Sequence, residues 1–242
     1  MYLAEELRTR ALWHGADYYG IADIAPAREY IRAQGGGRVA RYPRAVVMGI
    51  VLQDSLVDLL PEREDRAAAM LYRHNGYDVV NQTLDQIALA AANIIQRAGY
   101  AALPVPASKR ANDEKIAGVF SHKIAAHLAG LGWIGKSCLL VTPDHGPRVR
   151  WVTVLTDAPL KPTGGPMTER CGSCAECTDA CPIHAITGRA FTENESREAR
   201  LDAAACDGYF REIERTREVA VCGMCLYICP YGRKSRDKNP GK

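Results

Sequence analysis

The amino-acid sequence predicts an α+β fold. Two observations carry this prediction: long apolar patterns with helical spacing, and short β-branched runs bounded by proline and glycine. A third observation divides the chain, because the strand pattern stops in a segment rich in proline and glycine, residues 158–170, and cysteines punctuate the remainder of the chain. We therefore expect an α+β domain over residues 1–160 and a smaller cysteine-rich domain over residues 161–242.

The first expected element is a helix over residues 1–14. Leu3, Leu7 and Ala11 recur at helical spacing and predict one apolar face. Trp13 is expected to join that face. Three consecutive glycines at positions 35–37 then indicate a loop.

A β-branched apolar run over residues 44–52 is typical of a buried strand. The Ala-rich stretch over residues 65–98 predicts one long helix or two consecutive helices. Gly99 suits the helix end, because glycine adopts the left-handed conformation there at little cost. Residues 101–106 predict a second short strand.

The last elements before the cysteines are a helix over residues 116–130 and two strand-like runs, residues 137–143 and 149–157. Turn-forming residues separate the two runs at positions 144–148. This arrangement predicts a β-hairpin.

Composition is typical of a soluble globular protein, with 47% hydrophobic and 24% charged residues. Disorder is expected only at residues 233–242. The N-terminal segment lacks the apolar core of a signal peptide, and no run approaches the roughly 18 apolar residues of a membrane span. We therefore expect a cytoplasmic protein. Its formal net charge of +3 offers little attraction for nucleic acid.

Four cysteines have the spacing C-x2-C-x2-C-x3-C-P, namely Cys171, Cys174, Cys177 and Cys181. This run is typical of bacterial ferredoxins, in which the first three thiolates bind one 4Fe-4S cluster and the fourth binds a second cluster. One such run therefore predicts a partner run elsewhere in the chain.

The partner run contains one cysteine fewer than the first. It precedes Pro230, and Cys206 in a predicted helix can supply the missing thiolate. The crossed arrangement then gives two sets of four ligands for two clusters that move single electrons. The first set is Cys171, Cys174, Cys177 and Cys229, and the second set is Cys181, Cys206, Cys222 and Cys225.

A pair of zinc sites is the main alternative, because C-x2-C pairs also bind tetrahedral zinc. Three successive cysteines at this spacing followed by C-P suit a tetrahedral ion poorly. Disulfides are not expected in a reducing compartment. Cys138, the ninth cysteine, lies in an apolar run and is expected to be a buried strand residue without a ligand role.

Four segments extend the pattern beyond a generic ferredoxin: residues 129–143, 171–186, 201–209 and 221–231. Through them the chain resembles the cobalamin-dependent epoxyqueuosine reductases and the reductive dehalogenases. The resemblance implies a nitroreductase-like domain that binds cobalamin, followed by a ferredoxin-like domain with two 4Fe-4S clusters, one of which reduces the cobalt. Flavin is the alternative cofactor, because the resemblance also implies an ancestral flavin fold.

The segment GLGWIGK, residues 130–136, matches the glycine spacing of dinucleotide-binding proteins. The context differs, because here a predicted helix precedes the glycines and a strand comes after them. Glycine lets a backbone approach a planar ligand closely, and the resemblance places cobalamin here, with a plain helix-to-strand turn as the alternative. The residues expected to line cobalamin are Tyr77, Ser121, Gly132, Trp133, Ile134, Gly135, Lys136 and Ser137.

The epoxyqueuosine reductases carry an aspartate proton donor upstream of the glycine segment, and Ile116 stands at the matching position here. Asp113, Glu114 and His122 are the candidate proton donors nearby, because carboxyl groups and histidine act as general acids. The missing aspartate, and the lack of a helical-repeat extension after Lys242, argue against epoxyqueuosine in tRNA as the substrate.

These observations lead to two functional hypotheses. The first is a cobalamin-dependent iron-sulfur reductase of a small molecule, with ferredoxin or flavodoxin as the external one-electron donor. The second is an electron-transfer or corrinoid-reducing protein without its own substrate. A membrane partner is not expected. Binding to tRNA is not expected either, although arginines between residues 189 and 217 and the basic tail leave it open.

Overall fold

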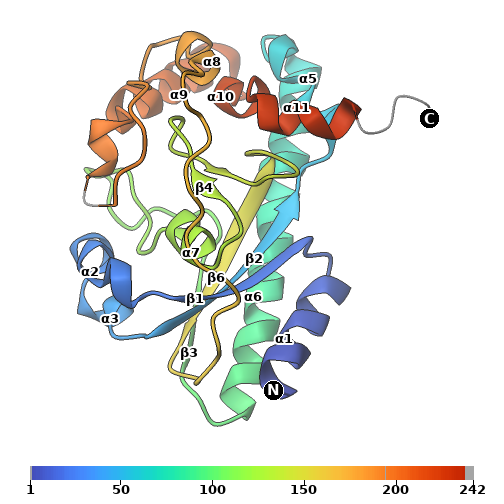
Figure 1. Ribbon diagram of the computed structural model, residues 1–242. Coiled ribbons are helices and arrows are strands. Elements are labelled where there is room, and N and C mark those ends of the chain that lie inside the picture. Colours follow the sequence, from blue (N-terminus) through green and yellow to red (C-terminus); the bar gives the residue numbers. More distant parts are fainter. Residues whose placement is uncertain (1, 194, 238–242) are drawn as a thin grey trace. The chain divides into compact units, whose positions relative to one another are not determined.

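The computed structural model describes residues 2–193 and 195–237 of the chain (Figure 1). The chain forms two compact units, each assembled from segments that are separated in sequence. The first unit comprises Met1–Val51, Val80–Gly132 and Arg150–Met167, and the second comprises Leu52–Val79, Trp133–Val149 and Thr168–Lys242. This division differs from a single boundary near residue 160, because two earlier segments belong with the cysteine segment.

The first unit is built on a four-stranded sheet with the strand order β1-β2-β6-β3. Strand β1 pairs antiparallel with β2, and β3 pairs antiparallel with β6. The two central strands, β2 and β6, are buried almost throughout, as expected for strands covered on both faces. The bounds are β1 Tyr18–Asp23, β2 Arg44–Val51, β3 Ala102–Val105 and β6 Val149–Thr156.

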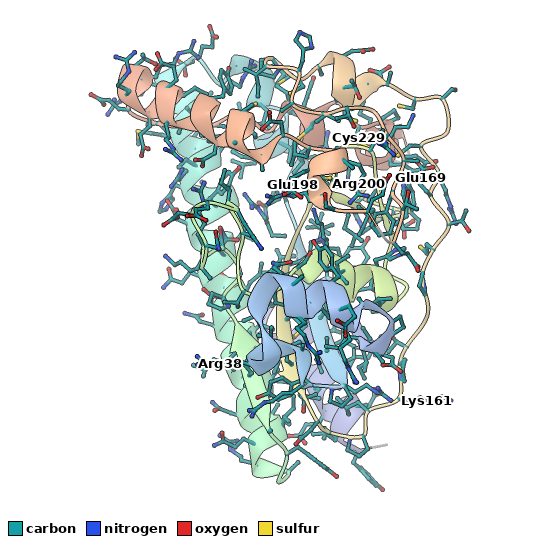
Figure 2. All side chains as sticks on the ribbon, turned by 90° about the vertical axis from the view of Figure 1, so that its left-hand side faces the viewer. Arg38, Lys161, Glu169, Glu198, Arg200 and Cys229 are labelled. Atoms are coloured by element: carbon teal, nitrogen blue, oxygen red, sulfur yellow. The ribbon has the colours of Figure 1, made fainter. Side chains whose placement is uncertain are left out.

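Helices cover both faces of this sheet. Figures 1 and 2 show the strands lying between α6 (Val80–Arg97) and α7 (His122–Leu128). Helix α6 buries a stripe with helical spacing that includes Leu84, Ile87, Ala91 and Ile95. The first helix packs beside α6. The remaining helices of the unit are α1 Tyr2–Trp13, η1 Ala25–Ala27, α2 Arg28–Gly35 and α3 Gly37–Ala40.

The second unit contains short helices and one short hairpin, in which β4 (Trp133–Ile134) pairs with β5 (Leu140–Val141). Arg148 is 1% exposed, and its guanidinium donates to Asp54 Oδ1 at 2.5 Å and Asp58 Oδ1 at 3.4 Å. The helices of the second unit are α4 Asp54–Val57, η2 Leu60–Glu62, α5 Arg66–Tyr72, the π-helix η3 Arg73–Val79, α8 Glu176–Asp179, η4 Arg197–Ala199, α9 Ala203–Arg217, α10 Met224–Tyr227 and α11 Pro230–Asp237.

Several expected elements are confirmed. The first helix, the strand over residues 44–52, the short strand within residues 101–106 and the helical stretch over residues 65–98 are all present, and Gly99 ends the long helix with a φ of 88°. The α+β class is therefore confirmed. No helix in the described part of the chain is long and apolar enough to cross a membrane.

The predicted hairpin between residues 137–143 and 149–157 is wrong. Strand β5 pairs with β4, whereas β6 pairs with β3 in the other unit. Cys138 explains part of the difference, since its φ of 60° places it in a turn and ends any strand there. Cys138 is buried as expected, but it is not a strand residue.

Four smaller expectations also differ from the structure. Trp13 is 74% exposed instead of joining the apolar face of its helix. The predicted helix over residues 116–130 begins only at His122, because Ile116 has a φ of 47° in a compact loop. The triple glycine lies within and between the short helices α2 and α3. The predicted disorder is wrong up to Asp237, the end of α11, while residues 238–242 lie outside the described residues.

Gly20 in β1 permits close contact between the sheet and the end of α7. A Cβ at this position would lie 2.9 Å from Ala129 Cβ and 3.2 Å from Leu131 Cδ1. We expect Gly20→Ala to destabilise the protein by about 1–3 kcal/mol through overpacking, which corresponds to a loss of roughly 2–4 °C in Tm for each kcal/mol. Circular dichroism during heating measures this loss.

Gly165→Ala is the matched control in the same unit, because a Cβ there meets nothing within 4 Å. Equal Tm values for Gly20→Ala and Gly165→Ala would contradict the proposed packing.

Candidate iron-sulfur centre

The eight cysteines of the two predicted sets all lie in the second unit, partly buried and free of disulfides. The two cysteine runs share a local conformation. Gly172 and Gly223, each directly after the first cysteine of its run, have φ values of 51° and 68°. Glycine adopts this left-handed conformation without the cost that a Cβ would impose. A four-residue helix, α8 or α10, comes next in each run.

The first predicted set combines three cysteines of one run with the last cysteine of the other. Burial raises the pKa of the Cys229 thiol, and the neighbouring thiols of Cys177 and Cys174 raise it further. Burial likewise raises the pKa of Cys171, to about 11, and a hydrogen bond with Glu169 adds to this. Cys229 therefore lies beside the first run, as the crossed arrangement requires.

The second predicted set includes the solitary cysteine of α9. Burial raises the pKa of the Cys206 thiol, and the nearby thiols of Cys222 and Cys181 raise it further. Burial also raises the pKa of Cys225, with further contributions from Cys222 and Cys206. The thiol of Cys177, which belongs to the first set, also raises the pKa of Cys225, so the two sets lie next to each other.

Local hydrogen bonds place the chain around α9. Asp202 caps this helix, since its side chain accepts from the Ala205 N–H at 2.9 Å. Its own N–H donates to the Ala185 carbonyl at 2.8 Å, which ties the start of α9 to the chain after Cys181. The N–H of Ala185 in turn donates to Cys181 Sγ at 3.3 Å. The cap therefore positions Cys206 near Cys181.

The donor set fits two cubane clusters. Burial disfavours ionisation of six of these thiols, and bound iron offsets this by binding the thiolate form. Within the described residues no three His, Cys, Asp or Glu side chains converge on a single ion position. A cubane does not require such convergence, because each of its four thiolates binds a different iron. Which cysteine binds which cluster stays a prediction.

The β4–β5 turn packs against the first set. Lys136 Nζ donates to the carbonyls of Gly172 at 2.7 Å and Cys174 at 3.0 Å. A Cβ on Gly135 would lie 2.9 Å from Val141 Cγ2 and 3.4 Å from Cys171 Sγ. Packing within this unit therefore explains the glycine at position 135. Sequence reasoning missed this contact, because it joins segments far apart in the chain.

Trp133 is fully buried in the same place. Its ring packs edge-on against Tyr231, with the ring centroids 4.7 Å apart, and the Arg170 guanidinium lies 5.4 Å from its centroid. Tyr231 in turn donates its hydroxyl to the Arg170 carbonyl at 3.1 Å. Ile134 and Ser137 are buried as well. These side chains hold the turn against both ends of the cysteine segment.

Residues 170–232 match the family described as the 4Fe-4S double cluster binding domain. This match contains all eight cysteines of the two sets, and it identifies the segment as one that binds two 4Fe-4S clusters.

Two curated proteins illustrate the relationship of the chain. It is 32% identical over 126 residues to the epoxyqueuosine reductase of Listeria monocytogenes, covering 48% of this chain and 31% of that protein. It is 33% identical over 114 residues to the tetrachloroethene reductive dehalogenase of Sulfurospirillum multivorans, covering 43% of this chain and 22% of that protein. Over the matched segments the chain is similar to members of the epoxyqueuosine reductase and reductive dehalogenase-like family. Less than a third of either relative is matched.

Solved structures of this family have the same fold over nearly the whole chain. A solved epoxyqueuosine reductase aligns with 97% of this chain and 66% of its own, at 20% identity and a TM-score of 0.61. A catabolic reductive dehalogenase aligns with 96% of this chain and 33% of its own, at 23% identity and a TM-score of 0.71. The first unit therefore shares its fold with these family members.

The residues expected to line cobalamin are divided between the two units. Ser121 and Gly132 belong to the first unit, whereas Tyr77 and the residues from Trp133 to Ser137 belong to the second. Tyr77 lies in the π-helix η3, with its ring 5.7 Å from that of Tyr72. The cobalamin contact of these residues stays a prediction.

The candidate proton donors all lie in the first unit. Asp113 and Glu114 are exposed in the loop before α7. His122 begins α7, and both of its ring nitrogens have partners: Nε2 donates to the Pro106 carbonyl at 3.0 Å, so Nδ1 accepts from the Thr153 hydroxyl at 2.9 Å. The catalytic role of the three residues stays a prediction.

Cys206→Ala tests the second set directly. It should reduce the iron content of anaerobically purified protein from about eight to about four atoms per chain, because one cluster loses a ligand while the other keeps four. Cys138→Ala is the matched control, since Cys138 is buried, belongs to neither predicted set and should leave iron unchanged. Equal iron loss in both variants would contradict the assignment.

His122 predicts a pH-dependent stability. Burial lowers the pKa of its imidazole to about 4, against a smaller opposing contribution from its hydrogen bond to Pro106 and the charge of Asp85. Between about pH 6.5 and pH 4 the unfolded chain binds a proton that the native chain does not, so stability falls as pH falls through this range. The loss should reach roughly 1–3 kcal/mol at pH 4.

We expect His122→Gln to flatten the dependence of Tm on pH between about pH 4 and pH 6.5, because glutamine keeps a donor and an acceptor but does not titrate. Exposed His14 provides the control, and His14→Gln should keep the dependence of the unmodified protein. Parallel pH curves for His122→Gln and the unmodified protein would exclude this source.

Proposed function

We propose that this chain is an iron-sulfur reductase of a small organic molecule, with two 4Fe-4S clusters held by the second unit and cobalamin as a further cofactor. The observation that carries this proposal is the extent of the fold likeness. Reductases of this family align with 96–97% of the chain, including the first unit, which contains no cysteine of the two sets. A pure electron carrier needs only the cluster segment.

The chemistry follows from the groups that this chain holds. When bound, the clusters supply single electrons and cobalamin supplies a reducing cobalt centre. The eight cysteines hold the clusters, and Lys136 fixes the backbone carbonyls of Gly172 and Cys174. Asp113 or Glu114 is the proposed proton source, because both carboxyl groups are exposed and can exchange protons with solvent. Ferredoxin or flavodoxin is the proposed external electron donor.

Cobalamin is preferred to flavin on the basis of a solved relative. The structure of one reductive dehalogenase suggests a mechanism for B12-dependent dehalogenation, and that structure aligns with 97% of this chain at a TM-score of 0.69. Its identity to this chain is 21%, so the likeness itself concerns the fold. The transfer of the cofactor to this chain is our proposal.

A small substrate is preferred to tRNA, although one solved epoxyqueuosine reductase holds a modified tRNA-Tyr stem loop. Ile116 stands where the resemblance places the aspartate proton donor, and its φ of 47° lies in a compact loop stabilised by backbone bonds between Asn112 and Ala117. The net charge of +3 also gives little attraction to phosphates.

The second candidate is an electron-transfer or corrinoid-reducing protein without its own substrate. The state of His122 favours it, because a neutral imidazole with both nitrogens engaged supplies no proton to a substrate.

Anaerobic reconstitution separates the candidates. We expect about eight irons and eight acid-labile sulfides per chain, and an EPR signal of base-off Co(II) at about one cobalamin per chain after incubation with cobalamin. Clusters without corrinoid binding would instead support the second candidate. A flavin spectrum in the purified protein would identify flavin as the cofactor in place of cobalamin. About two zinc ions per chain without iron would exclude the clusters.

Gly135→Val cannot serve as the cobalamin-deficient variant in this experiment. Its side chain would collide with Val141 and disturb Cys171, so clusters and corrinoid would be lost together.

A further inference from the structure

Several buried nitrogen atoms in the described part of the second unit form no hydrogen bond, and Trp133 Nε1 and Arg63 Nε are two of them. A buried donor without an acceptor costs about 1–3 kcal/mol, so native structures normally satisfy such groups. The two donors come from segments that precede the matched cluster family, residues 170–232. Each lies beside a cysteine of a different predicted set.

Trp133 borders the first set. Its ring contacts Tyr231 and Arg170, which flank the cysteine segment on both sides. Burial raises the pKa of Cys171 to about 11, and the indole N–H is one of the groups that lower it again. The indole therefore points toward the Cys171 sulfur, although it does not reach hydrogen-bond geometry with the thiol.

Arg63 borders the second set. Its Nη1 donates to Met224 Sδ at 3.3 Å and to the Leu60 carbonyl at 3.4 Å, and Met224 lies between Cys222 and Cys225 in the chain. Burial raises the pKa of Cys222, and the charge of Arg63 is among the causes that lower it. The unpaired Nε thus lies on a guanidinium anchored within the second run.

We propose that Trp133 and Arg63 each set the reduction potential of one cluster, by donating an N–H to a sulfur of the first and the second cluster respectively. This inference rests on the proposed clusters. Each cluster gains one electron on reduction, and the donors keep their protons. An N–H directed at sulfur, or a positive charge nearby, stabilises the more negative reduced cluster and raises its potential.

One further unpaired buried donor provides a contrast. Trp151 Nε1 also lacks a partner, but Trp151 lies in the first unit, in strand β6. Trp151→Phe is therefore the matched control for Trp133→Phe. Arg66 is exposed and paired with Glu218, so Arg66→Met controls for the loss of one positive charge close in sequence to Arg63.

The experiment is a redox titration of the anaerobically purified full chain, followed by EPR and visible absorbance. Trp133→Phe keeps an aromatic ring against Tyr231 and should lower the midpoint potential of one cluster only. Arg63→Met should lower that of the other cluster. Trp151→Phe and Arg66→Met should leave both potentials unchanged.

Iron analysis separates the possible failures. Unchanged potentials in variants that retain about eight irons, or a shift of the same cluster in both variants, would overturn the inference and leave the proposed clusters intact. Absence of iron in the unmodified protein would instead overturn the proposed function.

A second measurement covers the case in which Trp133→Phe loses its clusters. In the unmodified protein, labelled with 15N-tryptophan and reduced, pulsed EPR should detect an indole nitrogen coupled to a cluster. Trp13→Phe and Trp151→Phe should retain this coupling, since these are the other two tryptophans of the chain. Absence of the coupling would refute the hydrogen bond.

Discussion

The second unit depends on holding eight thiols together, six of them where burial makes the ionised form costly. Burial is the leading cause of the raised pKa of Cys171, Cys206, Cys222 and Cys229, and thiols of neighbouring cysteines add to it at Cys206 and Cys229. Bound iron reverses this cost by binding thiolates. The positive φ of Gly172 and Gly223, the cap of α9 and the β4–β5 turn all serve to bring these sulfurs together.

Segments outside the cysteine run complete this environment. Lys136 binds carbonyls in the first run, and Arg63 binds Met224 in the second. Gly223 lies against Leu60 and Tyr72, which belong to η2 and α5. The cluster family matched over residues 170–232 is therefore only part of the unit that surrounds the cysteines. This arrangement gives the chain a means of adjusting two similar clusters differently.

The eight cluster-binding cysteines could be identified from the sequence because their spacing is typical of ferredoxin-like runs. The long helix and strand β2 were predictable for a similar reason, since their apolar periodicity is local. The partner of β5 was not, because Leu140 and Val141 carry no signal that distinguishes Trp133 from a later strand. Strand β1 was missed for want of a long apolar run, and its register opposite β2 comes from tertiary pairing.

The expected role of the glycine segment shows the same limit. Its glycines permit other groups to approach the backbone closely. In the structure, Val141 and Cys171 are the groups that lie close to Gly135. Which group packs against a glycine depends on residues far away in the chain, so the local sequence around the glycine does not reveal it.

The interleaved segments also impose an order on biosynthesis. Leu52–Val79 leaves the ribosome well before the cysteine segment against which it packs, and domains generally fold during synthesis from the N-terminus. The side chains of Leu60 and Tyr72 are both at most 1% exposed in the folded chain. They are therefore synthesised before some of the residues that bury them. The clusters can form only after the cysteine segment has been synthesised, so the apolar surface of Leu52–Val79 stays uncovered until then.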